Sequence, residues 1–378
     1  MKTLNLLLLV LATSLAIVGQ AAALDEDGSN SHVKRFGAYG DGINDDTYAF
    51  QQAFAQVKAG GLIVLPDGNY TLSDTIVITK PVTIVGTGFA TQIYNKNNKT
   101  LFRFVNHNNS AIRDVYLGSN STQPGVSLIE FVNSHHNQIN NVTMLGAYYG
   151  LHLQGSLLNT IIDLRSGTNF QGFFAPTSST NTWVMAEAFN NISANANTFI
   201  APVLEGGTNG IVLSDAAGQG SLYLTGGTIE GVTGTGLTLQ GTFLPSSITG
   251  LHFEANGIAD VVLQSASNVR ISAIVSDKQI NLLGDTRNVT ISDSVAQNIF
   301  IDMGNGRYPL GTGAKRIILQ NITTCWAVGN GVISPAPTVD LAFGMPNGPS
   351  SPAIVNNNNG QPRKDIIYTN IGNLCGGG

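Results

Sequence analysis

Short apolar runs separated by turn residues occupy much of the chain. Within these runs apolar and polar residues alternate, which is typical of short β-strands with one buried face. Gly, Pro, Asn and Asp stand between the runs, as in Pro66-Asp67-Gly68, and these residue types favour turns. The first runs are Leu62–Leu65, Tyr70–Leu72, Thr75–Thr79 and Val82–Val85. The pattern therefore predicts a chain built mainly from short strands.

One helix is predicted before these strands, over Thr47–Lys58. Its apolar residues follow the helical spacing of three and four positions, and they are Phe50, Ala53, Phe54 and Val57. Asp45, Asp46 and Thr47 are residue types that favour a helix start, and Gly60-Gly61 favours its end. We expect the helix to cap the first strands, because uncovered strand edges invite aggregation.

An internal repeat determines how the strands are arranged. Asn268–Ser272 recurs twenty residues later as Asn288–Ser292 and, more loosely, as Arg316–Thr323. Upstream, residues 199–206, 224–231 and 248–255 align with periods of 25 and 24 residues. Units of this length with several short strands stack into a β-solenoid. We therefore predict an all-β fold, a single-stranded right-handed parallel β-helix with an N-terminal capping helix.

The expected organisation has four parts. Residues 1–23 combine Lys2, an apolar stretch and Ala21-Ala22-Ala23, the pattern of a cleaved signal peptide. Residues 24–32 form a flexible N-terminus, residues 33–326 the β-helix with its cap, and residues 327–378, which break the repeat, a C-terminal capping segment. We expect a secreted, extracellular protein that has no membrane association after signal cleavage.

Composition and charge agree with this organisation and narrow the partners. Only 11% of the residues are charged, Gly occurs 44 times, and the net charge is −5. Gly-rich, weakly charged composition suits strands and turns better than long helices. Nucleic acid is not an expected partner, because phosphate binding requires a basic surface and the chain has no basic run.

The expected export also makes a disulfide bond and asparagine glycosylation plausible modifications of this chain. An isolated pair, Cys325 and Cys375, favours a disulfide in an oxidising compartment, and two buried free thiols are the alternative. Eight Asn-x-Ser/Thr sequences are candidates for glycosylation, although Asn at turns and Thr in strands also produce them by chance. They begin at Asn69, Asn98, Asn108, Asn120, Asn141, Asn191, Asn288 and Asn321.

The segment Phe36–Ala53, with Gly40-Asp41-Gly42 followed by Asp45-Asp46-Thr47, resembles the opening of the pectate-lyase-superfamily β-helix proteins. This group includes pectin-lyase-like and rhamnogalacturonase/epimerase-like members. Gly61–Tyr70 is similar to the first coil of that family. The resemblance implies the β-helix fold and action on a polysaccharide or oligosaccharide substrate, by a monomer or a homotrimer. It assigns the three aspartates a structural role, and the active-site motifs of the polygalacturonase and calcium pectate lyase branches are not found.

The repeat aligns four acidic residues in one column: Glu205, Glu230, Glu254 and Asp277. Each Glu follows an apolar residue that we expect to face the core, so alternation directs the carboxylates outward. Adjacent coils of a solenoid lie about 4.8 Å apart, which brings these carboxylates into the range of the two acids of a glycosidase. We predict a catalytic column that hydrolyses glycosidic bonds, without a cofactor or metal. A ladder of polar side chains at a coil corner is the alternative.

Other residues are candidates for substrate binding or for a different reaction. His252, Arg165 and Tyr148 are candidates for binding sugar. A polysaccharide lyase, which eliminates across a uronate, needs a base and a cation, and Tyr149, His152 and Arg165 are its candidates; a lyase would also admit calcium. A non-catalytic glycan-binding or structural β-helix is the third hypothesis.

Overall fold

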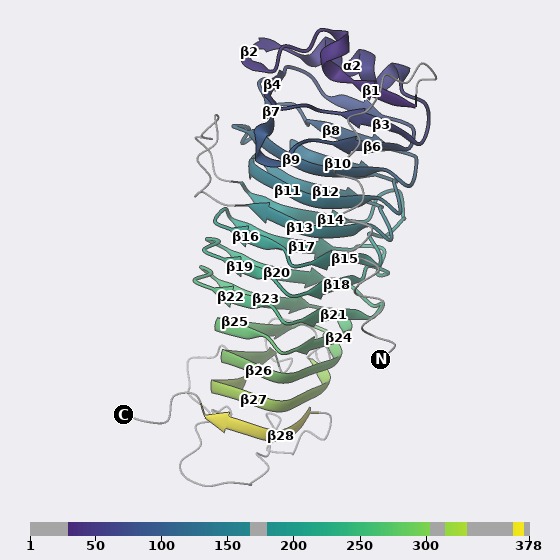
Figure 1. The fold of residues 1–378 in the computed structure, drawn as a ribbon. Coiled ribbons are helices and arrows are strands. Elements are labelled where there is room, and N and C mark those ends of the chain that lie inside the picture. The colour runs from purple at the N-terminus through teal and green to yellow at the C-terminus, as the bar shows by residue number, and fades with distance from the viewer. Residues whose placement is uncertain (1–28, 167–179, 303–313, 331–365, 374–378) are drawn as a thin grey trace, which may run out of the picture.

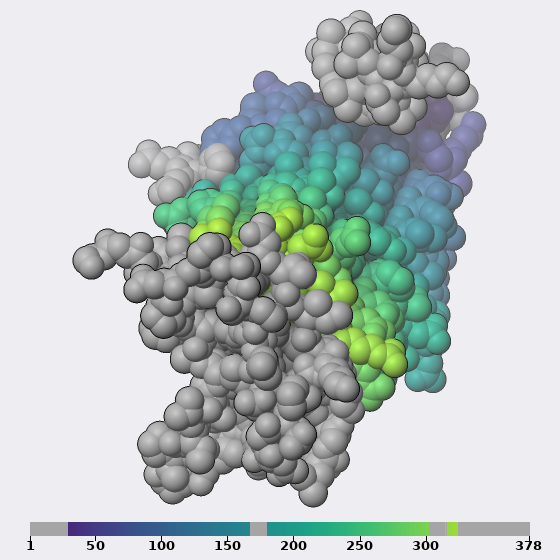
Figure 2. Space-filling view, turned by 90° about the horizontal axis from the view of Figure 1, so that it is seen from below, coloured from purple at the N-terminus to yellow at the C-terminus, as the bar shows by residue number. Residues whose placement is uncertain are grey.

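The computed structural model describes residues 29–166, 180–302, 314–330 and 366–373. In these residues the chain winds into a stack of coils whose strands pair in parallel with the strands of the next coil (Figure 1). Seen from below, the later coils lie in front of the earlier ones (Figure 2). The parallel β-helix predicted from the repeat is thereby confirmed.

The strands form three faces, here called face I, face II and face III. Face I contains β5 (Ile76–Ile78), β8 (Phe102–Val105), β10 (Ser127–Val132), β12 (Tyr149–Gln154), β14 (Thr182–Glu187), β17 (Asn209–Ser214), β20 (Thr235–Gln240) and β23 (Ala259–Gln264). Face II contains β1 (Asn30–His32), β3 (Gly61–Val64), β6 (Val82–Val85), β15 (Asn197–Ile200), β18 (Leu222–Thr225), β21 (Ser246–Thr249) and β24 (Ser267–Ser272). Face III contains β2 (Asp41–Asp45), β4 (Gly68–Leu72), β7 (Thr91–Asn95), β16 (Val203–Glu205), β19 (Thr228–Glu230) and β22 (His252–Glu254).

Longer strands run from one face to the next. β9 (Ala111–Ser119), β11 (Gln138–Gly146) and β13 (Thr160–Ser166) continue from face II to face III. β25 (Val275–Leu283), β26 (Arg287–Asp302), β27 (Lys315–Asn330) and β28 (Ile366–Asn373) complete the stack.

The core is a set of apolar columns inside the stack. In one column Phe199, Leu224 and Ile248 lie in register on three successive coils, and each is at most 1% exposed. Ile271, Ile291 and Leu319 continue it. Burying one such side chain contributes about 1.5–3 kcal/mol. Because no coil can bury its apolar residues alone, stacking stabilises all of them together.

The N-terminal region differs from the prediction in two places. Residues 30–32, expected to be flexible, form strand β1, which pairs with Leu62–Val64. Helix α2 spans Thr47–Gln56, two residues shorter than expected, and lies at the N-terminal end of the stack (Figure 1). Asp46 stands at the start of this helix without a side-chain cap. It instead accepts the backbone N–H of Tyr39 at 2.6 Å and of Thr71 at 3.2 Å, so its role is to join the turn to the next coil.

The C-terminal part also differs. The segment 327–378 was expected to cover the last coil, but β27 reaches Asn330, and β28 pairs in parallel with β27. The described parts of this segment, residues 327–330 and 366–373, therefore continue the stack. Residues 1–28, which include the expected signal peptide, and Cys375 lie outside the described residues. Among the described residues, no helix has the length and apolar character needed to cross a membrane.

Candidate functional site

The predicted acidic column lies at the end of face III. Glu205 pairs in register with Glu230, and Glu230 with Glu254, on β16, β19 and β22, which are stacked at one edge of the solenoid (Figure 1). Leu204, Ile229 and Phe253 precede these residues and are fully buried. The alternation of the strand therefore directs the three carboxylates outward, as the sequence predicts.

A sharp corner follows each glutamate. Gly206, Gly231 and Ala255 have φ angles of 66°, 62° and 53°, in the left-handed region that favours glycine. The N–H of Gly206 donates to the carbonyl of Glu230 at 2.9 Å, and the N–H of Gly231 donates in the same way to the carbonyl of Glu254. Repetition of this corner holds each glutamate at an equivalent place in three coils.

Asp277 extends the column by one coil in a different role. Its Oδ2 accepts the backbone N–H of Ala255 at 2.9 Å. Asp277 is exposed, but this bond commits one of its carboxylate oxygens to the corner that follows Glu254. The structure thus places Asp277 beside the column and gives it a contact that supports the backbone.

Glu205 and Glu230 form the most perturbed pair of the column. Both are half-buried, and they lie opposite one another on adjacent strands. Burial raises the pKa of Glu205, and the neighbouring Glu230 raises that pKa further. Both influences favour the protonated form of Glu205 over the form expected of a lone surface carboxylate.

Cations do not compensate the acidic pair. Within the described parts of the chain, no Lys, Arg or His side chain forms an ion pair with Glu205 or Glu230. Glu254 has His252 nearby, with Nε2 at 3.9 Å from Oε2, and both side chains are exposed. Like charges opposite one another destabilise a sheet. Such uncompensated acids are typical of sites retained for chemistry.

Arg165 does not join this column. It lies opposite Val203 on the adjacent coil, two positions before Glu205. Its guanidinium donates to both carboxylate oxygens of Asp163, at 2.7 and 2.6 Å. Arg165 is therefore engaged in an ion pair within its own strand.

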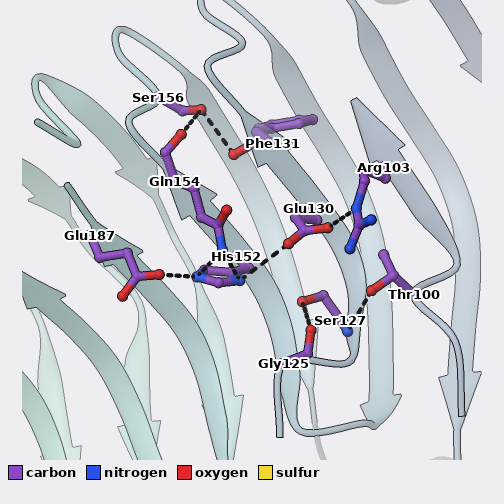
Figure 3. Close-up of polar contacts among 10 residues, drawn as sticks. All are labelled: Thr100, Arg103, Gly125, Ser127, Glu130, Phe131, His152, Gln154, Ser156 and Glu187. Carbon is purple, nitrogen blue, oxygen red and sulfur yellow. Dashed lines mark hydrogen bonds and ion pairs between the residues drawn. The ribbon is translucent and has the colours of Figure 1, made fainter. Parts of the chain in front are cut away.

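A second polar cluster, which the sequence analysis missed, lies on face I. Its members are Arg103 on β8, Glu130 on β10, His152 on β12 and Glu187 on β14 (Figure 3). Arg103 Nε donates to Glu130 Oε2. His152 Nδ1 lies 3.6 Å from Glu130 Oε1, and His152 Nε2 lies 2.9 Å from Glu187 Oε1.

Basic and acidic residue types alternate along the stack in this cluster. Glu130 and His152 are each 3% exposed, and each has partners on the coils above and below it. The pKa of Glu187 is lowered, and the hydrogen bond with His152 is the largest cause of this shift. A buried acid with such partners needs no ligand to satisfy it. The signal available in the sequence was one charged residue, Glu130, within the apolar strand Ser127–Val132.

The three lyase candidates are not brought together. The rings of Tyr149 and His152 lie 4.6 Å apart on face I, and Tyr148 lies 4.8 Å from Tyr149. Burial raises the pKa of Tyr149, which favours the protonated phenol. Arg165 lies on face III, and among the described residues no contact joins it to Tyr149 or His152.

Metal ligands show no grouping in the part of the chain that the structure describes. There, no set of three or more His, Cys, Asp or Glu side chains has an arrangement that could hold a metal ion. The disulfide expected between Cys325 and Cys375 cannot be placed, because Cys375 lies outside the described residues.

Comparison with known proteins identifies one matching protein family and several solved structures with a similar fold. The family model for rhamnogalacturonase A/epimerase, pectate lyase-like proteins matches residues 31–241. No curated protein sequence matches the chain significantly.

Solved structures share the fold at low sequence identity. PfbA, a surface adhesin of Streptococcus pneumoniae, has a TM-score of 0.60 at 14% identity, over 90% of this chain and 99% of that chain. The A-module of the Azotobacter vinelandii mannuronan C-5 epimerase AlgE4 has a TM-score of 0.57 at 19% identity, over 79% and 88%. ORF18 of Geobacillus virus E2 has a TM-score of 0.53 at 16% identity, over 80% of this chain and 61% of that chain.

Proposed function

Because the chain belongs to the rhamnogalacturonase A/epimerase, pectate lyase-like family, we propose that it is a secreted enzyme that acts on polysaccharide. We further propose that it hydrolyses glycosidic bonds at the column of Glu205, Glu230 and Glu254. The AlgE4 module, whose name describes an epimerase of a polysaccharide, supports the substrate class. The expected signal peptide supports secretion.

The observation that carries this proposal is the stacking of Glu205 directly opposite Glu230 on adjacent coils, with no cation paired to either among the described residues. A general acid must keep its proton near neutral pH, and enzymes achieve this by burial and by a nearby like charge. Both act on Glu205 and raise its pKa. The face I cluster has no comparable uncompensated acid, because each of its carboxylates has a positive or hydrogen-bonding partner.

In the proposed reaction Glu205 gives its proton to the glycosidic oxygen as the bond from that oxygen to the anomeric carbon breaks. Glu254, the exposed member of the column, takes a proton from the water that attacks this carbon. Glu205 and Glu254 are two coils apart, which corresponds to about 10 Å between strands. This is close to the separation of about 6.5–9.5 Å of inverting glycosidases, so we expect inversion at the anomeric carbon. Exchange with water then restores both protonation states.

Incubation with a panel of neutral and uronic polysaccharides tests the proposal. New reducing ends without absorbance from unsaturated uronates are expected, with the inverted anomer seen first by NMR. Glu205→Gln and Glu254→Gln should each lower the rate at least about a hundredfold, the scale of a lost acid or base. Asp285→Asn, which removes an exposed carboxylate that pairs with Arg287, is the matched control. Unchanged rates in both Gln variants of an active protein contradict the assignment.

A lyase reaction on face I is the second candidate function, favoured by the contact between Tyr149 and His152. Here Arg103, with 42% of its side chain exposed, replaces Arg165 as the cation. Absorbance from unsaturated uronates, lost in Tyr149→Phe and retained in Glu205→Gln, would select this reaction. No activity on any polymer, with binding retained, would instead support a glycan-binding protein.

A further inference from the structure

A groove lies at the N-terminal end of face I, between helix α2 and the outer side of β5. It encloses a cavity of about 420 Å³. The helix contributes Gln51 and Ala55 to its wall, and the strand and its ends contribute Thr75, Val77, Thr79 and Lys80. No step of the proposed hydrolysis uses this groove, which lies on a different face from the acidic column.

The local sequence explains why the groove is open. On β5, Ile76 and Ile78 are buried in the core, so alternation directs Val77 outward, where it is 53% exposed. On α2, Phe50, Ala53 and Phe54 are buried, which leaves Gln51 and Ala55 on the exposed side. Lys80 Nζ donates to the carbonyl of Ala55 at 3.0 Å. This bond ties the end of the helix to the strand and fixes the width of the groove.

The lining of the groove suits a neutral sugar. Val77 and Ala55 offer apolar contact to the C–H face of a pyranose, while the hydroxyl groups of Thr75 and Thr79 and the amide of Gln51 can bind sugar hydroxyls. Within the described residues the side chains of Gln51 and Thr79 have no polar partner of their own. Asp74 and Lys80, at opposite ends of β5, have opposite charges, so the groove favours neither an anion nor a cation.

The size of the groove agrees with this ligand class. Small-molecule sites range from about 300 to 1,000 Å³, and combine apolar walls with a few placed polar groups. The groove lies near the lower end of this range, which fits one or two sugar units better than a long segment. We propose that it is an accessory carbohydrate-binding site that holds neutral sugar units of a polysaccharide.

Binding without turnover tests this proposal. In the Glu205→Gln background, isothermal titration and saturation-transfer NMR are performed with short neutral oligosaccharides and with uronate oligosaccharides of the same length. We expect the neutral series to bind, with its C–H protons saturated by the protein. Ala55→Phe places a ring in the groove and should weaken binding at least about tenfold, equivalent to about 1.4 kcal/mol.

A matched control separates groove filling from damage to the helix. Gln56→Phe adds the same ring to an exposed position of α2 that is not part of the groove lining, and it should leave affinity unchanged. Equal affinity in Ala55→Phe and Gln56→Phe overturns the site, and tighter binding of uronates overturns its ligand class. Ala55→Phe with Glu205 restored should still hydrolyse short substrates at the normal rate. The binding measurements therefore test the groove, the hydrolysis rates test the acidic column, and either proposal can fail without the other.

Discussion

The position of Glu205 opposite Glu230 couples the proposed chemistry to stability. A carboxyl group whose pKa is higher in the folded state than in the unfolded state stabilises the fold only at low pH. Its contribution is fully present below the unfolded pKa and is lost as pH rises through the folded pKa. Glu205 belongs to this class, so at neutral pH it is a weak point of the fold.

We therefore expect Glu205→Gln to make the protein more stable at neutral pH. At pH 7 a carboxyl group with a raised pKa must either hold a proton that the unfolded chain releases or carry a charge opposite Glu230, and the neutral amide avoids both costs, on the order of 0.2–1 kcal/mol. Urea unfolding at pH 7 and at pH 4 measures the effect, and the gain should shrink at the lower pH. A loss of stability at pH 7 would contradict this expectation, because it would mean that the Glu205 carboxyl group makes a stabilising contact that the amide cannot replace.

Glu187 should show the opposite pH dependence. Its pKa is lowered by the hydrogen bond from His152, so its contribution is present above the unfolded pKa and is lost as pH falls through the folded pKa. Glu187→Gln should cost about 0.5–1 kcal/mol at pH 7, because the side chain is partly exposed. The difference from wild type should vanish in acid. Asp285→Asn serves again as the exposed control.

The eight sequons differ in the bonds of their asparagines. Asn141 Nδ2 donates to Asp114 Oδ1 at 2.7 Å, and Asn288 Nδ2 donates to Asn268 Oδ1 at 2.9 Å. A glycan on either nitrogen would crowd the adjacent coil. Asn98 and Asn191 are exposed, and no bond of this kind holds them within the described residues. In a eukaryotic secretory host, glycopeptide mass spectrometry should find Asn98 and Asn191 more often occupied than Asn141 and Asn288.

These residue-level differences explain which site residues could be predicted. Glu205, Glu230 and Glu254 follow one another at nearly constant spacing, so alignment of the repeat found them. Arg103 and Glu130 are 27 positions apart, whereas Glu130 and His152 are 22 apart. Loops of unequal length separate these coils. No single period reveals such a cluster, because only the folded register brings its members together.

At the scale of single elements, the apolar strand positions hold the carboxylates in place. Ile229 is fully buried and directly precedes Glu230, between Leu204 and Phe253 on the adjacent coils. The sequence predicted these strands well, because alternation fixes which side of a strand is buried. It did not predict β28, which joins the stack only after a long separation from β27 along the chain.

Shortening the core side chain beneath the column should loosen it. Ile229→Ala leaves a cavity and should destabilise the fold by about 2–5 kcal/mol. Thr228→Ala, at the neighbouring outward position, should change stability by no more than about 0.5 kcal/mol. Urea unfolding followed by circular dichroism compares the two variants. Similar small losses in both would mean that the coils close around the cavity.

At the scale of the whole molecule, the solenoid separates its surfaces by face. Face III carries the acidic column, while face I carries the compensated cluster and the groove beside α2.

The expected signal peptide makes a prediction for the whole chain. Expressed in a secreting host, the protein should appear in the medium with Leu24 as its first residue, because Ala21-Ala22-Ala23 has the small residues of a cleavage site. N-terminal sequencing of the secreted product measures this. An intact Met1–Ala23 segment on membrane-bound protein would contradict both cleavage and the extracellular location.

The equivalent corners after Glu205, Glu230 and Glu254 have a consequence for how the proposed active site could change. Distances between groups on one face are not continuously adjustable but come in steps of one strand spacing, about 4.8 Å. Losing the one coil that lies between two acids would move them from two steps apart to one, without disturbing the core register. The stereochemical outcome of sugar cleavage, which depends on that separation, would then switch through a change in coil number alone.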